Sequence, residues 1–227
     1  MKVKTVLVAS MAIGSIGLVT QSCLAVATSG IGIAVLKQVL LGGITKGVGI
    51  FSNKNAFMQN DLINQALPAP LREINSVLER ISPSLVQKEK EYIAQAAAYT
   101  VQTAEPILRN AVNSLTPEDV RQVANGGKGA ATRLLKAKTA DQLMLAIQPK
   151  VDEKLNEYGI VKSLNLALQG NNLLGGLLGT GDQNLNLASG GLSRLASEQM
   201  VEGLFKIIEN HEMENSFQLL NALQNSK

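Results

Sequence analysis

The chain has 227 residues, of which only 3% are aromatic and none is Trp. A core built from Leu, Ile, Val and Ala favours helices, because sheets draw more on aromatic and β-branched side chains. The net charge is only +3. Nucleic-acid binding needs a concentrated basic face, so this small charge argues against nucleic acid as a partner.

Residues 1–22 form a predicted signal peptide. Lys2 and Lys4 precede an apolar run of 14 residues, 6–19. This run is too short for a transmembrane helix and is typical of a signal-peptide core. We find no later apolar run long enough to span a bilayer. The sequence therefore predicts an exported protein.

Two cleavage points follow this apolar run. Residues 20–23, TQSC, resemble a lipobox, although Leu is usual in place of Thr20. Residues 25–27, AVA, instead fit an ordinary signal peptidase. Cys23 is the only cysteine, which rules out an internal disulfide and a Cys-based zinc site. We expect lipidation at Cys23, which anchors the protein to a bacterial membrane, facing the periplasm.

The mature chain is expected to have two parts. Residues 23–60 form an apolar, Gly-rich segment with one helix at about 31–48, followed by a polar loop at 52–60. Its glycines allow another helix to approach closely, or the segment serves as a tether. Residues 61–227 form an all-helical domain. Removing Lys2 and Lys4 from the 21 basic residues leaves 19 against 18 acidic ones, so the mature chain is nearly neutral.

Capping and proline signals divide this domain. Asp61 is predicted to cap a short turn, Pro70 to begin the next helix, and Ser82 to cap the longest helix. That longest helix has Pro106 inside it and is expected at the centre of the fold. Its predicted buried stripe is Leu85, Tyr92, Ala96, Tyr99, Thr103, Ile107, Ala111 and Leu115.

Further start and stop signals follow. Thr116 is predicted to cap a helix that ends at 126–127, and a short helix at 129–137 comes next. Thr139 is predicted to open a helix that ends at Gly159. Its predicted buried stripe is Leu143, Ile147, Val151, Leu155 and Tyr158. We expect another helix at 160–169 and a last helix at about 193–223. The Gly- and Asn-rich residues 170–192 between them are either the least ordered stretch of the chain or a long packed loop. The predicted fold is all-α, a single irregular multi-helix bundle after an N-terminal signal peptide.

Several short segments carry a family resemblance through their order and spacing: 36–40 with Gly43, 67–71, 115–119, 126–127, 130–132, Thr139, 148–151 and 203–205. In this order they resemble the bacterial family known as domain of unknown function 4197. The resemblance covers about residues 36–210, and it implies an exported, helical, often lipid-anchored protein with no known activity. The chain departs from the family in its loop at 170–192 and in its ending after Glu214.

Weak metal candidates lie near the C-terminus. Glu209, His211 and Glu212 share one helical stretch and have side chains that bind cations. His211 is the only histidine, whereas the metalloprotease pattern needs two on one helix face. A solvated helix end explains the cluster more simply. We predict no metal and no cofactor.

Other candidate groups lack a partner. Residues 125–129, NGGKG, offer free backbone N–H groups to an anion, or are simply a helix stop followed by a helix start. Glu91 and Glu105 flank the central stripe, where burial would raise a carboxyl pKa. No Ser/His/Asp set is recognisable, so we predict no catalytic residue. The three tyrosines are expected in the core with a polar tip.

Three functions remain open. The first is a non-catalytic envelope lipoprotein that acts as a scaffold or binds a partner. The second is a carrier of an apolar ligand such as an acyl chain, with 31–51 and 170–192 as mobile covers. The third is a hydrolase whose site is unrecognised.

Overall fold

A computed structural model describes residues 30–169 and 191–224. The predicted signal peptide, Cys23, both cleavage points and most of the segment at 170–192 lie outside these residues.

Within the described residues the fold is all-α, as predicted, and no strand occurs there. The helices, in chain order, are α2 (Gly30–Phe51), α3 (Lys54–Met58), α4 (Asp61–Gln65), α5 (Ala69–Ile81), α6 (Pro83–Asn113), α7 (Pro117–Gly126), α8 (Ala130–Glu157), α9 (Ile160–Gln169), α11 (Gly191–Glu214) and α12 (Ser216–Gln224).

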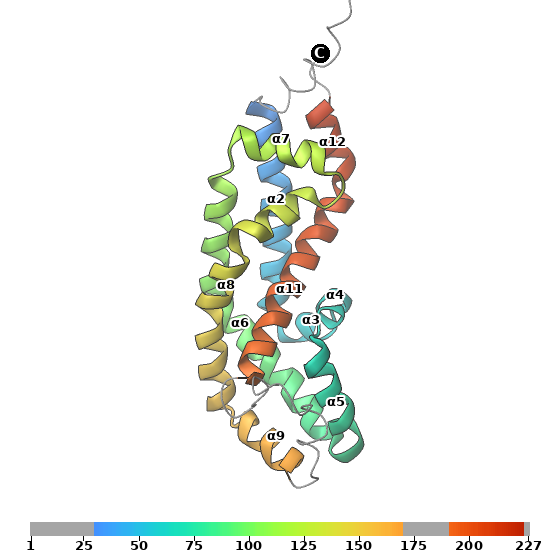
Figure 1. The fold of residues 1–227 in the computed structure, drawn as a ribbon, viewed down its shortest axis with the longest axis vertical. Coiled ribbons are helices and arrows are strands. Elements are labelled where there is room, and N and C mark those ends of the chain that lie inside the picture. Colours follow the sequence, from blue (N-terminus) through green and yellow to red (C-terminus); the bar gives the residue numbers. More distant parts are fainter. Residues whose placement is uncertain (1–29, 170–190, 225–227) are drawn as a thin grey trace, which may run out of the picture.

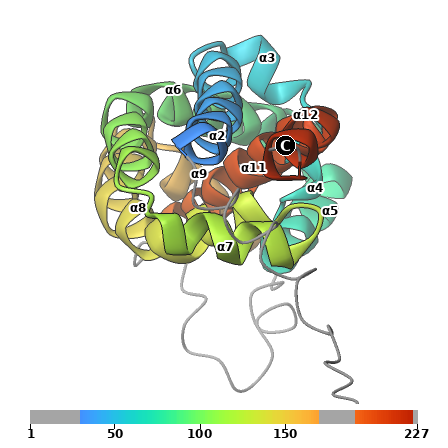
Figure 2. The same cartoon turned by 90° about the horizontal axis from the view of Figure 1, so that it is seen from above.

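The four long helices α2, α6, α8 and α11 form the body of the molecule (Figure 1). They pack in a ring, in which α6 contacts α2 and α8, and α11 contacts α8 and α2 (Figure 2). Helices α7 and α12 lie at one end of this bundle, and α5 and α9 lie at the other (Figure 1). Aliphatic side chains from all of these helices form one hydrophobic core.

Helix α2 is part of this core. Leu36, Leu40 and Ile44 are fully buried. Its glycines allow the close approach that the sequence predicts, since a Cβ at Gly43 would lie 3.1 Å from Ile208 Cα of α11. By length and composition α2 is also long and apolar enough to cross a membrane. This differs from our expectation that no apolar run after the signal peptide is long enough to do so. The buried face of α2 packs against α6 and α11.

The buried face of α6 lies one position away from the predicted stripe. Among the predicted residues Tyr99 is 41% exposed. Its ring lies at the rim of the bundle, 4.6 Å from Lys154 Nζ of α8, because an amphipathic side chain keeps its polar tip in water. The buried residues are Val86, Glu89, Ile93, Ala94, Ala96, Ala97, Thr100, Ala104, Leu108 and Val112.

The predicted break between 137 and 139 does not occur. Helix α8 is continuous, and Thr139, the predicted cap, is buried inside it. Its hydroxyl donates to Leu135 O at 2.7 Å, which satisfies a buried threonine within a helix. The stripe predicted after this point is confirmed, because Leu143, Ile147, Val151 and Leu155 are buried.

Asparagines account for three other differences from the predicted elements. Asn53 caps α3 inside the predicted loop at 52–60, and its Oδ1 accepts from Ala56 N at 3.0 Å. Asn60, not Asp61, caps α4. The predicted last helix is divided into α11 and α12 at Asn215, whose Nδ2 donates to His211 O at 2.8 Å.

Of the other predicted caps, Thr116 is confirmed, whereas Ser82 takes the predicted N-cap position without the capping hydrogen bond. Thr116 and Asp119 form a capping box, in which Asp119 N donates to Thr116 Oγ1 at 3.3 Å and Thr116 N donates to Asp119 Oδ2 at 2.9 Å. Ser82 makes no side-chain hydrogen bond to the start of α6, which begins with Pro83. The missing N–H of a proline reduces the number of free donors at a helix start.

Candidate functional site

A pocket of about 250 Å³ lies among α3, α4, α5, α6 and α11. Asn64 and Lys90 are exposed and mark its rim. Its floor is buried and combines apolar with polar side chains. The lining residues are Phe57, Met58, Asn64, Leu67, Asn75, Glu89, Lys90, Ile93 and Gln199.

Glu89 is the acidic group of this pocket, and only 1% of its surface is exposed. It stands on the buried face of α6 between Val86 and Ile93. Asn75, which is buried on α5, donates from Nδ2 to Glu89 Oε2 at 3.3 Å. Glu89 Oε1 and Asn75 Oδ1 are buried and find no hydrogen-bond partner in the part of the chain that the structure describes. Buried polar atoms are nearly always paired, so these two acceptors need an explanation.

A third buried polar side chain comes from α11. Gln199 is buried, and its Nε2 donates to Ile63 O at 3.4 Å. The pocket therefore joins polar groups from the consecutive helices α5 and α6 with one from α11, which lies far from them in the sequence.

Burial raises the pKa of Glu89 from 4.5 to about 7. The hydrogen bond from Asn75 and the positive charge of Lys90 act in the opposite direction and offset only part of this rise. Burial acts this way because a low-dielectric interior disfavours the charged form of a carboxyl group. Near neutral pH Glu89 therefore exchanges its proton, and either form is accessible.

This arrangement is suited to binding. An ionised carboxylate and an amide oxygen are both acceptors, so the open atoms of Glu89 and Asn75 invite hydrogen-bond donors. A carboxyl of this pKa also has the acidity of a general acid or base. Among the described residues that line the pocket, however, none is Ser, Thr, Cys or His, which are the common nucleophiles and bases.

The sequence analysis missed Glu89, Asn75 and Gln199. A signal for Glu89 was present, since it lies three residues after Val86 and four before Ile93, on the face that helical spacing buries. The predicted stripe ran through Leu85 and Tyr92 instead. The predicted buried face of this helix was therefore one residue away from the observed one.

The weak metal candidates do not form a common site. Glu209 Oε1 lies against Gly129, where a Cβ would approach it to 2.5 Å, and His211 Nε2 lies equally close to the Cβ position of Gly42. Glu212 is turned towards the start of α8. No group of three His, Cys, Asp or Glu side chains that could hold a metal ion occurs among the described residues.

Glu212 occupies the anion position at the start of α8, directly after the glycine-rich loop. Its carboxylate accepts from Ala131 N at 3.1 Å, from Thr132 N at 2.8 Å and from Thr132 Oγ1 at 2.6 Å. Gly127 and Gly129 have φ of +72° and +74°, which glycine adopts readily. A helix stop, a helix start and an internal carboxylate thus account for the loop.

Glu91 and Glu105 are not buried acids. Glu91 pairs with Lys54 at 3.2 Å, and hydrogen bonds from Gln87 and Lys54 lower its pKa, where we expected burial to raise it. Glu105 pairs with Arg109 on the same helix at 2.6 Å. The residue with the predicted property is Glu89, on the neighbouring face of α6.

The tyrosines do not all lie in the core as expected, since Tyr99 is 41% exposed. Tyr92 and Tyr158 stack with their ring centroids 4.7 Å apart, and both are half-buried.

Comparison with known protein families identifies a match. The model of a family described as "Protein of unknown function (DUF4197)" matches residues 28–215, which confirms the predicted resemblance. No curated protein and no solved structure matches the chain.

Proposed function

This chain belongs to the DUF4197 family of proteins of unknown function, and we propose that it is an envelope lipoprotein that binds a small amine in the pocket of Glu89. The amine carries a positive charge and a short apolar chain. The protein acts as a binding protein and not as a catalyst.

The observation that supports this proposal is the pair of open acceptors, Glu89 Oε1 and Asn75 Oδ1, buried beside the pocket. An ammonium group supplies several N–H donors and a positive charge, and such charge-assisted hydrogen bonds are among the strongest in proteins. It would stabilise the ionised form of Glu89, which burial otherwise disfavours. Phe57 and Ile93 provide apolar surface for the rest of the ligand.

The size of the pocket limits the ligand. A volume of about 250 Å³ exceeds what one water needs and is below the range of about 300–1,000 Å³ typical of drug-sized ligands. A primary amine with a few carbon atoms is the appropriate class.

The envelope location rests on the sequence. Residues 1–22 have the pattern of a signal peptide, and Cys23 follows a lipobox-like segment. Acylation of Cys23 would anchor the helical body to a bacterial membrane on its periplasmic side.

The carrier of an acyl chain receives less support. The pocket with an almost wholly apolar lining, among α2, α6, α8 and α11, has a volume of only about 10 Å³, far below the needs of an acyl chain. Of the two segments considered as mobile covers, 31–51 belongs to the packed helix α2.

Calorimetric titration of the mature protein with ethylamine, propylamine and ethanolamine tests the proposal. We expect binding at pH 8 that weakens about tenfold for each pH unit below 7, as the ionised fraction of Glu89 falls. Glu89→Gln should abolish it, whereas Glu105→Gln, a matched change on the same helix, should not. Uncharged 1-propanol should not bind.

Two results would contradict this function. One is the absence of binding by all three amines at pH 8. The other is equal binding by the wild type and the Glu89→Gln variant. Native mass spectrometry of the membrane-extracted protein would additionally show whether Cys23 is acylated and which small molecule accompanies it.

A further inference from the structure

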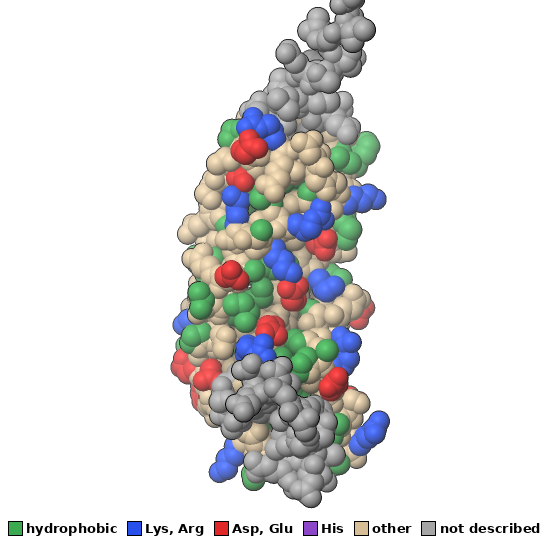
Figure 3. Space-filling view, viewed as in Figure 1, with side chains coloured by type: hydrophobic (Ala, Val, Ile, Leu, Met, Phe, Trp, Pro, Cys, Tyr) green, Lys and Arg blue, Asp and Glu red, His purple; other side chains and the backbone are tan. Residues whose placement is uncertain are grey.

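Apolar side chains are exposed at the end of the bundle where α2 begins. Phe217 and Leu220 of α12 are 78% and 43% exposed, Met213 at the end of α11 is 46% exposed, and Ile31 in the first turn of α2 is 66% exposed. Figure 3 shows hydrophobic side chains on the surface in the region of α12, at the upper right. An exposed apolar cluster on a folded protein marks an interaction surface.

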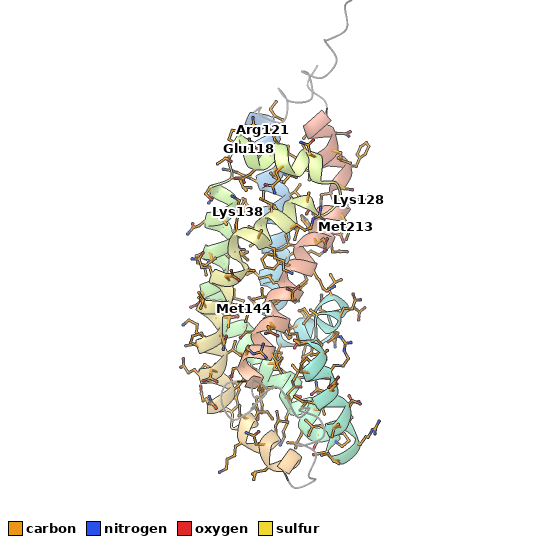
Figure 4. All side chains as sticks on the ribbon, in the orientation of Figure 1. Glu118, Arg121, Lys128, Lys138, Met144 and Met213 are labelled. Atoms are coloured by element: carbon orange, nitrogen blue, oxygen red, sulfur yellow. The ribbon has the colours of Figure 1, made fainter. Side chains whose placement is uncertain are left out.

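These residues share a geometry that suits insertion. Phe217 and Leu220 are three positions apart, which places them on the same face of α12. Met213 and Leu220 also line a groove of about 150 Å³ beside Lys128. Figure 4 shows Lys128 and Met213 next to each other. A lysine at the edge of an apolar surface can hold its ammonium group among lipid phosphates while its stem covers the apolar side chains.

The position of the proposed anchor indicates what covers this surface. Gly30 begins α2 at the end of the bundle where α12 lies (Figure 1), and α12 packs against α2. Cys23 precedes Gly30 by seven residues, and a chain of that length spans at most about 25 Å when fully extended. An acylated Cys23 therefore keeps this end of the bundle close to the bilayer.

We propose that the end formed by α12, the end of α11 and the start of α2 lies on the membrane, with Phe217, Leu220, Met213 and Ile31 in contact with lipid. This inference rests on the proposed acylation of Cys23 and is independent of the amine pocket. In this orientation the opposite end of the body, with α5 and α9, points away from the bilayer (Figure 1).

Depth-dependent fluorescence quenching tests this orientation. The acylated mature protein is reconstituted in vesicles of phosphatidylethanolamine and phosphatidylglycerol that contain a nitroxide lipid. An environment-sensitive dye is attached to a new cysteine in Phe217→Cys or, at the opposite end, in Lys162→Cys of α9. We expect strong quenching of the dye at 217 and weak quenching at 162. Equal quenching, or stronger quenching at 162, would overturn the inference.

A second set of variants tests the apolar contact itself. With the dye in Lys128→Cys, the double change Phe217→Ser and Leu220→Ser should reduce quenching. The matched change Leu145→Ser and Leu166→Ser removes two side chains elsewhere on the surface that are at least as exposed as Phe217 and Leu220, and it should leave quenching intact. All four positions are exposed, so these variants should fold. If both pairs act alike, the surface makes no special lipid contact.

The mass of the N-terminal peptide separates the two proposals. An acylated Cys23 with equal quenching at 217 and 162 contradicts the orientation and supports the anchor. An unmodified N-terminus at Thr28 contradicts the anchor and, with it, this orientation. Crosslinking of the dye-free Phe217→Cys variant to a second copy would show that the surface is a protein interface and would also overturn the inference.

Discussion

Two glutamates are buried in the helical body, and their surroundings differ. Glu212, 3% exposed, accepts three hydrogen bonds from Ala131 and Thr132 at the start of α8. Glu89, 1% exposed, accepts one from Asn75 and leaves Oε1 without a partner among the described residues. The first lies where backbone donors and the positive end of a helix favour a carboxylate, and the second faces a pocket.

This difference in hydrogen bonding distinguishes a buried carboxylate that stabilises the fold from one that is retained for a function. A carboxylate that helix donors satisfy holds two elements together, here α11 and α8. A carboxylate without enough donors costs stability in its charged form and is retained for another reason, such as binding. Changing each glutamate should therefore have opposite effects on folding.

The largest effect is expected for Glu212→Ala. This change leaves buried donors at the start of α8 without an acceptor, which should lower the free energy of unfolding by about 4 kcal/mol. Urea denaturation at pH 7 measures it. Glu214→Ala, which removes a surface pair with Lys46, should lower the free energy of unfolding far less, because water screens an exposed ion pair. Equal effects of the two changes would contradict a structural role for Glu212.

Glu89→Gln should act in the opposite direction. Burial raises the pKa of Glu89 from 4.5 to about 7, so the folded state retains a proton that the unfolded chain loses at lower pH. Stability therefore falls as the pH rises from about 4.5 to about 7, by about 3 kcal/mol in total. The glutamine variant lacks this fall and should be the more stable protein at pH 8.

Thermal denaturation between pH 4 and pH 8 measures this effect. The two proteins should differ little below pH 4.5 and most above pH 7, where about 3 kcal/mol corresponds to roughly 6–12 °C for a chain of this size. Glu105→Gln is the control, and its stability should fall with rising pH as that of the wild type does. If the Glu89→Gln variant were less stable than the wild type at pH 8, the claim that the Glu89 carboxylate lacks sufficient donors would be contradicted.

The smallest effect is expected for Asn75→Ala. The hydrogen bond from Asn75 lowers the pKa of Glu89, so its removal should raise that pKa further above its ordinary range, by less than about one unit. The pH at which stability ceases to fall should move upward accordingly. Asn64→Ala, at the rim of the pocket, should not change the pH at which stability ceases to fall. If both variants raised this pH by a similar amount, a specific role for Asn75 would be contradicted.

The sequence was informative about the elements and much less about the site. The composition predicts an all-α fold, and the Thr116 box and the stripe from Leu143 to Leu155 are confirmed because capping and helical spacing are local properties. Thr139 has the same local signal but lies inside α8, where packing decides the outcome. The pocket was not predicted, because it joins α5, α6 and α11, whose contacts depend on tertiary packing.

The most direct test of the uncompensated carboxylate is the titration of Glu89 by carboxyl-carbon NMR, with and without ethylamine. We predict a midpoint at about pH 7 in the free protein and a lower midpoint with the amine, because the ammonium ion favours the ionised form. A midpoint near the ordinary value of 4.5, or one that ethylamine does not change, would contradict the account.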